Sequence, residues 1–220
     1  MTTTTVTAKT ATGPVTTRTL LTAAALAAPV WVVVSLAQAF TRAGFDLTRH
    51  PLSQLATGEL GWIQIATFVT VGVLFIAGAT GLRRALHGRP GGVWTPRLIR
   101  TVGVGMIAAG AFTMDAGDGF PVGTPAGPPA GMSWHAIAHM AAGSITFLAL
   151  AAAGFVLGRH FTRTGDRTSA IISRVAGVAV IVGNGWTMSG GRFGSLTLAI
   201  GVSVALAWVS TVAYRLRNHT

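Results

Sequence analysis

The stretch Gly61-Trp-Ile-Gln-Ile-Ala-Thr-Phe-Val-Thr-Val-Gly-Val-Leu-Phe-Ile-Ala-Gly-Ala-Thr-Gly-Leu82 contains no charged side chain, and Arg83-Arg84 follow it at once. A helix that spans a bilayer needs about 20 consecutive, mostly apolar residues. Arginines directly after such a run are typical of the cytoplasmic boundary of a membrane helix. The stretch therefore predicts a transmembrane helix whose carboxyl end faces the cytoplasm.

Five more apolar runs of similar length lie on either side of this stretch. The sequence thus predicts an all-α, polytopic membrane protein with six transmembrane helices in one bundle. The expected helices cover 19–40, 61–82, 97–114, 133–157, 170–188 and 194–214. They form one domain over 18–215, between a disordered threonine-rich tail over 1–17 and a cytoplasmic tail over 216–220. Small residues throughout the runs favour close helix packing.

The composition supports this class of protein. Half of the residues are hydrophobic and 10% are charged, whereas a soluble domain carries about 25% charged residues. There is no cysteine, which excludes disulfides and thiolate metal sites. The net charge of +11 comes from short arginine clusters between apolar runs, not from one basic face. We therefore expect the lipid bilayer and its anionic headgroups as partners, and no nucleic acid.

The basic residues also predict the orientation. If the helices alternate, 13 of the 16 basic residues lie on one side, and the other three are Arg42, Arg49 and Arg192. The excess places both termini in the cytoplasm and the protein in the cell membrane as a multi-pass protein. A competing interpretation takes the first run, with Ala37-Gln38-Ala39 after it, as a cleaved signal peptide, which leaves five spans. We interpret this run as a membrane anchor.

The polar residues gather on the opposite, extracytoplasmic side. Asp115-Ala-Gly-Asp118 ends one apolar run, and His135 and His139 open the next. Titratable groups beside hydrocarbon are costly and mark sites. We expect an outward-facing site whose candidate catalytic residues are His50, Asp115, Asp118 and His135.

A metal is one interpretation of these residues. His135 and His139 are four apart, share one face of a helix, and form a half-site for zinc. Asp115, Asp118 or His50 could complete this site. Bound zinc would activate a water for hydrolysis. Other interpretations are metal-free proton chemistry by a carboxylate and an imidazole, and a structural role in which the histidines cap helices and Arg192 pairs with Asp115 or Asp118.

Several motifs resemble, in order, the bacterial membrane-protein family called domain of unknown function 998. They are His50-Pro51-x-Ser53-x-Leu55, Gly58, Gly61-Trp62-Ile63-Gln64, Phe68 to Gly72, Gly81-Leu82-Arg83-Arg84, Gly103-x-Gly105, Gly110-x-Phe112-x-x-Asp115, Gly119-x-Pro121, Gly123 and His135. The resemblance covers about residues 25–212 and implies a six-helix integral membrane protein without an established activity. Ala116 stands where the family's pattern suggests proline.

A looser similarity links the chain to the membrane hydrolases that include alkaline ceramidases and adiponectin-receptor-like proteins. Those proteins use Ser, His and Asp residues and a late HxxxH pair to bind zinc. The same residue types occur here in that order, as His50, Ser53, Asp115, His135 and His139. Those hydrolases have seven helices, however, and here the HxxxH pair falls on the fourth expected helix. The similarity is an analogy only.

Two functions remain open on these grounds. One is a membrane-embedded enzyme, a metal-dependent hydrolase or an acid/base lyase or cyclase, that acts on a lipid or isoprenoid-like substrate. The other is a small non-enzymatic transporter or an accessory subunit, in which the Asp/His cluster is an ion, proton or structural site. The chain has no P-loop, Rossmann or serine-elbow motif, which argues against nucleotide-dependent chemistry.

Overall fold

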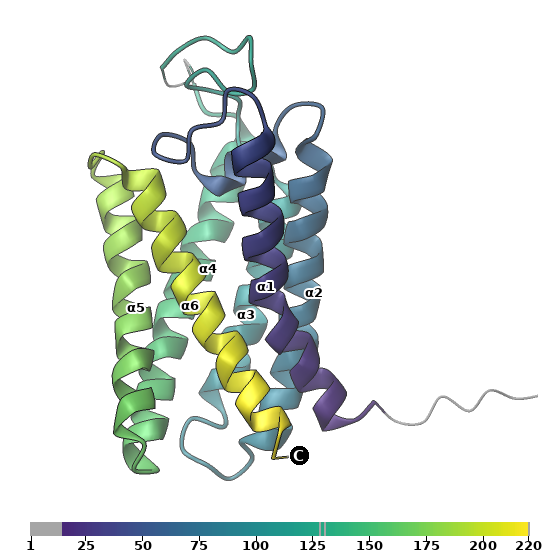
Figure 1. Cartoon of the computed structure of the whole chain (residues 1–220), viewed down its shortest axis with the longest axis vertical. Helices are drawn as coiled ribbons and strands as arrows, with labels where there is room; N and C mark the ends of the chain where they lie inside the picture. Colours follow the sequence, from purple (N-terminus) through teal and green to yellow (C-terminus); the bar gives the residue numbers. More distant parts are fainter. Residues whose placement is uncertain (1–14, 128, 130, 220) are drawn as a thin grey trace, which may run out of the picture.

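The computed structural model describes residues 15–127, 129 and 131–219. Within them, six α-helices and one short 3-10 helix make up the fold (Figure 1). The elements are α1 (Thr17–Thr41), η1 (Leu52–Ala56), α2 (Gly61–Ala85), α3 (Trp94–Ala111), α4 (Trp134–Arg163), α5 (Arg167–Met188) and α6 (Gly194–Arg217). The prediction of an all-helical protein is confirmed. Of the expected amino-terminal tail, residues 1–14 lie outside the described residues, and Thr17 already begins α1.

Five of the described helices, α1, α2, α4, α5 and α6, are long and apolar enough to cross a membrane. The helix α3 is different, because it has 18 residues and carries Arg97 and Arg100 within its first two turns. At about 1.5 Å per residue, α3 is about 27 Å long. The helices therefore have the composition and length of a multi-pass membrane protein, and α3 is the described α-helix that falls short of a span by composition alone.

The six helices form a ring. Each helix packs against its neighbours in the sequence, and α6 closes the ring by packing against α1. In Figure 1 the yellow α6 runs diagonally across the bundle between α5 and α1. Phe75, Leu82, Leu150 and Leu206 are among the buried core side chains that these helices share. The order of the six helices in the sequence is thus also their order around a common interior.

Glycines set the closest helix contacts, as the small residues of the sequence predict. A Cβ added to Gly72 of α2 would lie 2.6 Å from the carbonyl oxygen of Gly103 of α3, and a Cβ on Gly103 would meet the carbonyl oxygen of Gly72 at the same distance. Gly154 of α4 and Gly177 of α5 make a similar close approach. Without side chains between them, the backbones gain dispersion contacts that drive association in lipid.

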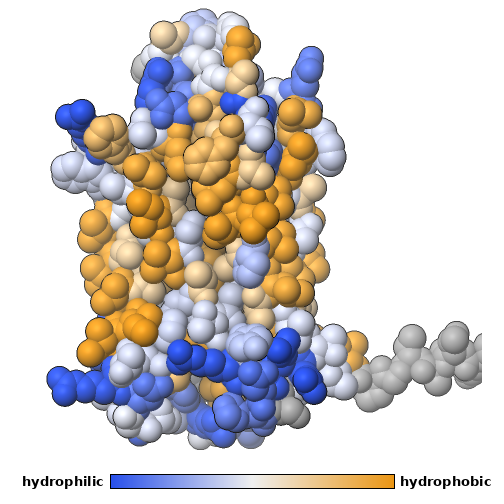
Figure 2. Space-filling model, in the orientation of Figure 1, coloured by the Kyte–Doolittle hydropathy of each residue, from blue (hydrophilic) through white to orange (hydrophobic). Residues whose placement is uncertain are grey.

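The two ends of the bundle differ in charge. We call the end with the α1–α2, α3–α4 and α5–α6 connections the loop end, and the opposite end the basic end. All the described arginines belong to the basic end except Arg42, Arg49 and Arg192. Figure 2 shows a hydrophobic band around the middle and a hydrophilic lower rim. Trp62, Trp94, Trp134 and Trp186, all near helix ends, are exposed, as expected of aromatic side chains at a membrane interface.

Candidate functional site

His50 joins the two longer connections of the loop end. Its Nδ1 accepts a hydrogen bond from the backbone N–H of Asp46 at 2.9 Å. Because Nδ1 is therefore the acceptor nitrogen, Nε2 carries the proton and donates to the carbonyl oxygen of Asp118, also at 2.9 Å. The side chain is 1% exposed and packs beside the rings of Phe45 and Phe120. Both ring nitrogens are engaged, so His50 positions the loops.

Asp118 forms an ion pair with Arg49. The guanidinium donates to both carboxylate oxygens, at 2.6 and 3.2 Å, and the backbone N–H of Gly127 donates to the same carboxylate. The hydrogen bond from Arg49 lowers the pKa of Asp118 below its usual value. The expectation that Arg192 is the counter-ion was wrong, because Arg192 lies over the ring of Phe193 instead.

Asp115 lies in a different contact, at the start of α4. Its Oδ2 accepts a hydrogen bond from the backbone N–H of Ser133 at 2.7 Å, and this bonding to Ser133 lowers the pKa of Asp115. Ser133 is the N-cap of α4, as the sequence predicts, and its hydroxyl accepts from the N–H of Ala136. His135 is exposed and stacks on Trp134, with ring centroids 3.6 Å apart. Asp115 thus holds the N-cap residue of α4, while His135 lies exposed in the first turn of that helix.

His139 occupies a third environment, inside the bundle. Its Nδ1 lies 2.9 Å from the carbonyl oxygen of Ala109 and 2.7 Å from that of Phe112. Because both neighbours are acceptors, Nδ1 carries the proton, which satisfies carbonyls that the last turn of α3 leaves without helical partners. The other nitrogen, Nε2, is then the one with a free lone pair. His139 is 6% exposed.

These positions bear on the predicted site in two ways. The structure brings His50 and Asp118 together, but it separates both from Asp115 and His135, and these from His139. In the part of the chain that is described, no three His, Asp or Glu side chains gather closely enough to hold a metal ion. His135, His139 and Asp115 lie in separate contacts in this structure, and the zinc site stays a prediction.

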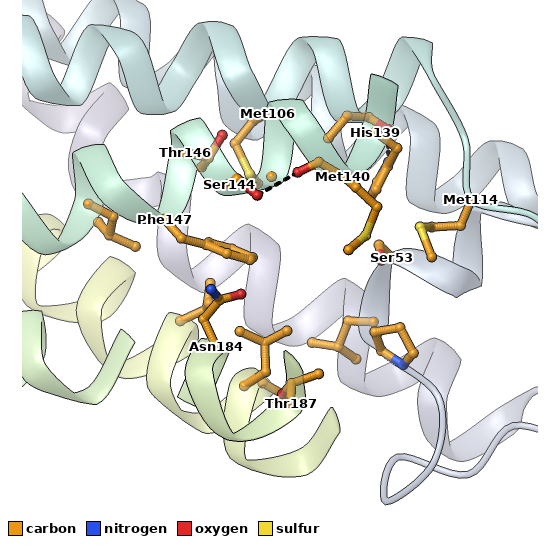
Figure 3. Close-up of a pocket in the computed structure, with 18 of the residues that line it drawn as sticks. Ser53, Met106, Met114, His139, Met140, Ser144, Thr146, Phe147, Asn184 and Thr187 are labelled. Carbon is orange, nitrogen blue, oxygen red and sulfur yellow. Dashed lines mark hydrogen bonds between the residues drawn. The ribbon is translucent and has the colours of Figure 1, made fainter. Parts of the chain in front are cut away.

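The interior of the ring contains a cavity of about 250 Å³ on the loop-end side (Figure 3). Most of its lining is apolar, including Phe68, Met106, Met114, Met140 and Phe147. All six helices and η1 contribute residues to it. A mainly apolar cavity with a few polar groups is the usual form of a small-molecule site. This volume exceeds the roughly 150 Å³ that suffices for benzene in an apolar cavity.

Four polar groups on the cavity wall have no hydrogen-bond partner within the described residues. They are the Ser53 hydroxyl, the Asn184 amide, Nε2 of His139 and Nε1–H of Trp31. Figure 3 shows Ser53, His139 and Asn184 around the same space, from η1, α4 and α5. By contrast, Thr187 and Ser195 are satisfied by backbone carbonyls. The side chains of Trp31 and His139 are buried, and those of Ser53 and Asn184 are half-buried. Leaving a buried polar group unpaired costs about 1–3 kcal/mol, so a ligand that pairs with Nε1–H of Trp31 would remove such a cost.

The cavity reaches the surface between α4 and α5. Its wall includes Ser144 and Met188, which are exposed. The two helices pack closely through Gly154 and Gly177 nearer the basic end. A Cβ on Gly143, toward the loop end, would meet only a ring carbon of Phe147, at 4.0 Å. The helices therefore leave a side opening near the loop end.

Sequence reasoning placed the chemistry in the outer loops and missed the cavity. Ser53 belongs to the motif His50-Pro51-x-Ser53-x-Leu55, and Asn184 belongs to no motif of the sequence. Trp31 was not singled out. A signal for His139 was present, because its spacing from His135 places it one turn deeper in the bundle. No local pattern could show that Trp31, Ser53 and Asn184 meet, since they lie on separate elements.

The ring of apolar helices, with its basic end and interior cavity, defines a multi-pass helical membrane protein. The chain belongs to the family described as protein of unknown function (DUF998), whose model matches residues 25–215. The resemblance of the sequence motifs to this family is therefore confirmed. No curated protein and no solved structure matches the chain. The looser similarity to the alkaline-ceramidase-like hydrolases thus has no support from known proteins.

Proposed function

We propose that this protein binds a lipid- or isoprenoid-like molecule in the cavity within its helix ring. The observation that carries the proposal is the mainly apolar cavity whose wall presents four unpartnered polar groups. The apolar part of the ligand would contact Phe68, Met106 and Phe147. Its polar end would receive or donate hydrogen bonds at Ser53, His139 and Asn184.

The orientation proposed for the protein has the basic end in the cytoplasm and the loop end outside the cell membrane. The arginine excess at one end supports it. All six helices span the bilayer in this arrangement, because α3 is enclosed between α2 and α4 and its arginines lie in its first two turns, where long side chains reach the interface. The ligand then enters from the outer half of the bilayer, through the opening between α4 and α5.

Acid/base catalysis on the bound molecule is the second candidate function. It is favoured by the hydrogen bonds that fix Nδ1–H of His139 against the carbonyls of Ala109 and Phe112. An imidazole held in this tautomer presents Nε2 as a base. In this second candidate function the reacting group is His139, whereas the sequence predicted His50, Asp115, Asp118 and His135. The reaction then requires no metal.

A cavity-filling variant tests the binding proposal. Gly143 lines the cavity, and a side chain added there meets almost nothing. We expect the phenyl ring of Gly143→Phe to occupy the cavity. Wild type should retain a hydrophobic molecule through purification, and the variant should not. Mass spectrometry of solvent extracts of the two purified proteins measures the amount retained. The matched control is Gly185→Phe, at a position on α5 with open space around it and outside the cavity wall.

Two further variants separate recognition from folding. Ser53→Ala and Asn184→Leu remove polar groups that have no internal partner, so we expect unchanged thermal stability without ligand and weaker retention of the molecule. Retention of the same molecule at the same level by wild type, Gly143→Phe and Gly185→Phe would contradict the proposal. For the catalytic candidate, His139→Gln would keep binding but lose turnover of the identified molecule.

A further inference from the structure

A second hollow lies at the basic end, far from the cavity along the helices. It has a volume of about 920 Å³ and lies where the end of α2, the α2–α3 connection and the start of α3 meet. Four arginines line it, namely Arg83, Arg89, Arg97 and Arg100, together with His87. We call it the arginine pocket. No carboxylate is among its lining residues.

The guanidinium groups of the arginine pocket lack anionic partners. Within the described residues, Arg83, Arg89, Arg97 and Arg100 form no ion pair. Arg83 and Arg89 make no side-chain hydrogen bond within the described residues, Arg97 lies over the ring of Trp94, and Arg100 donates only to the hydroxyl of Thr80. Four like charges around one hollow repel one another, and an anion between them would remove that repulsion.

The surroundings of the pocket indicate what the anion belongs to. Val93 and Val104 also line it and are exposed, and the neighbouring Trp94 is 59% exposed. Val104 is 55% exposed and lies one helical turn beyond Arg100, toward the middle of the bundle. A pocket with guanidinium groups at the end of a membrane helix and apolar side chains beside them complements a phosphate joined to acyl chains. A free phosphate would contact only the arginines of the pocket and not its apolar side chains.

We propose that the arginine pocket binds the headgroup of an anionic phospholipid from the leaflet at the basic end. The phosphate lies among Arg83, Arg89, Arg97 and Arg100, each of which can donate two parallel hydrogen bonds to phosphate oxygens. The acyl chains then run past the exposed Val104 toward the middle of the bundle. Such a lipid also neutralises the positive charge of Arg97 and Arg100 at the start of α3, the helix whose composition alone does not suit a bilayer.

Native mass spectrometry of the full chain, in detergent with added lipid, tests this proposal. We expect wild type to bind one phosphatidylglycerol in preference to phosphatidylcholine. Arg89→Gln/Arg97→Gln should weaken phosphatidylglycerol binding about tenfold or more, since each arginine near a membrane surface contributes on the order of 1 kcal/mol and a tenfold change corresponds to about 1.4 kcal/mol. The matched control is Arg163→Gln/Arg167→Gln, exposed arginines of the same end that lie outside the pocket.

Three results would overturn the proposal. The first is that wild type binds phosphatidylglycerol and phosphatidylcholine equally. The second is that the pocket variant and the control variant weaken phosphatidylglycerol binding equally. The third is that millimolar inorganic phosphate displaces the lipid, which would define a site for free phosphate. Each variant's unfolding temperature without lipid shows whether it is folded. If Arg89→Gln/Arg97→Gln is unstable, Arg89→Lys/Arg97→Lys replaces it, and the charge-preserving variant should retain most of the binding.

Discussion

At the scale of single residues, the histidines near the loop end differ in what their ring nitrogens contact. His50 uses both nitrogens within the protein, His139 uses one, and His135 is exposed beside Trp134. A buried imidazole with two partners contributes to stability, whereas one with an uncommitted nitrogen beside a cavity is available to a ligand. The three residues therefore have separate roles.

Removal of His50 should destabilise the protein much more than removal of His135. His50→Ala leaves the N–H of Asp46 and the carbonyl of Asp118 without their shared partner and opens space beside Phe120. We expect a loss of about 1–3 kcal/mol, measured as a lower unfolding temperature in detergent. His135→Ala should change the unfolding temperature little. A larger effect of His135→Ala than of His50→Ala would show that these roles are assigned wrongly.

The ion pair of Asp118 with Arg49 predicts a pH dependence. Because Arg49 lowers the pKa of Asp118 in the folded protein, the pair contributes fully above the ordinary pKa of about 4. Its contribution is lost as the pH falls through the lowered value. The unfolding temperature of wild type should therefore fall toward that of Asp118→Asn as the pH is lowered from about 6 to 3.

The effect of this pair is small, because both side chains are substantially exposed and salt screens such pairs. Raising the salt concentration at pH 6 should reduce the difference between wild type and Asp118→Asn. Asp115 is unchanged in both proteins, so its own titration cancels in the comparison. A difference that stays constant from pH 6 to 3 would contradict the assigned ion pair.

At the scale of elements, glycine pairs decide where neighbouring helices touch and where they separate. The α2–α3 contact rests on Gly72 and Gly103, and the α4–α5 contact on Gly154 and Gly177. Toward the loop end, Gly143 of α4 and Gly185 of α5 have almost no neighbours. The cavity and its side opening therefore follow from the uneven placement of close contacts along α4 and α5.

The α2–α3 contact gives a direct test of this packing. A Cβ on Gly72 would lie 2.6 Å from both a backbone oxygen and the Ile107 side chain, and a backbone neighbour cannot move as a flexible side chain can. We expect Gly72→Ala to lower the unfolding temperature clearly. Gly185→Ala, in open space on a helix, should leave it unchanged or raise it, because alanine favours helix more than glycine by about 1 kcal/mol. Equal stability of the two variants would contradict the glycine contact.

At the scale of the whole molecule, the helices follow from local patterns in the sequence, whereas the contacts of the candidate site depend on residues far apart in the chain. Apolar runs and flanking arginines are local signals, so the six helices and the charged end could be recognised residue by residue. The partner of Asp118 could not be recognised from a local pattern, because Arg49 is 69 residues away in the chain. By charge alone, any arginine of the loop end could pair with Asp118. The cavity also depends on distant residues, since Trp31, Ser53 and Asn184 come together only when the ring closes.

The orientation of the whole protein can be measured because the chain has no cysteine. Single cysteines at Glu59 or Val122 report on the loop end, and cysteines at Thr164 or Asn218 report on the basic end; all four positions are exposed. With a membrane-impermeant maleimide on intact cells, we expect labelling at Glu59→Cys and Val122→Cys only. Permeabilised cells should label all four. Labelling at Thr164→Cys in intact cells would contradict the cytoplasmic basic end.

Photo-crosslinking tests the central claim, a ligand in the cavity, most directly. A photoreactive benzoylphenylalanine replaces Phe147, which lines the cavity, or the adjacent Leu148, which is 71% exposed on the outside of α4. After irradiation in cell membranes, mass spectrometry of the protein should show one discrete adduct at position 147 and a broad mixture of bulk lipids at position 148. Gly143→Phe should remove the adduct at 147 and leave the mixture at 148. The same lipid mixture at both positions, or no adduct at 147, would contradict a specific ligand within the helix ring.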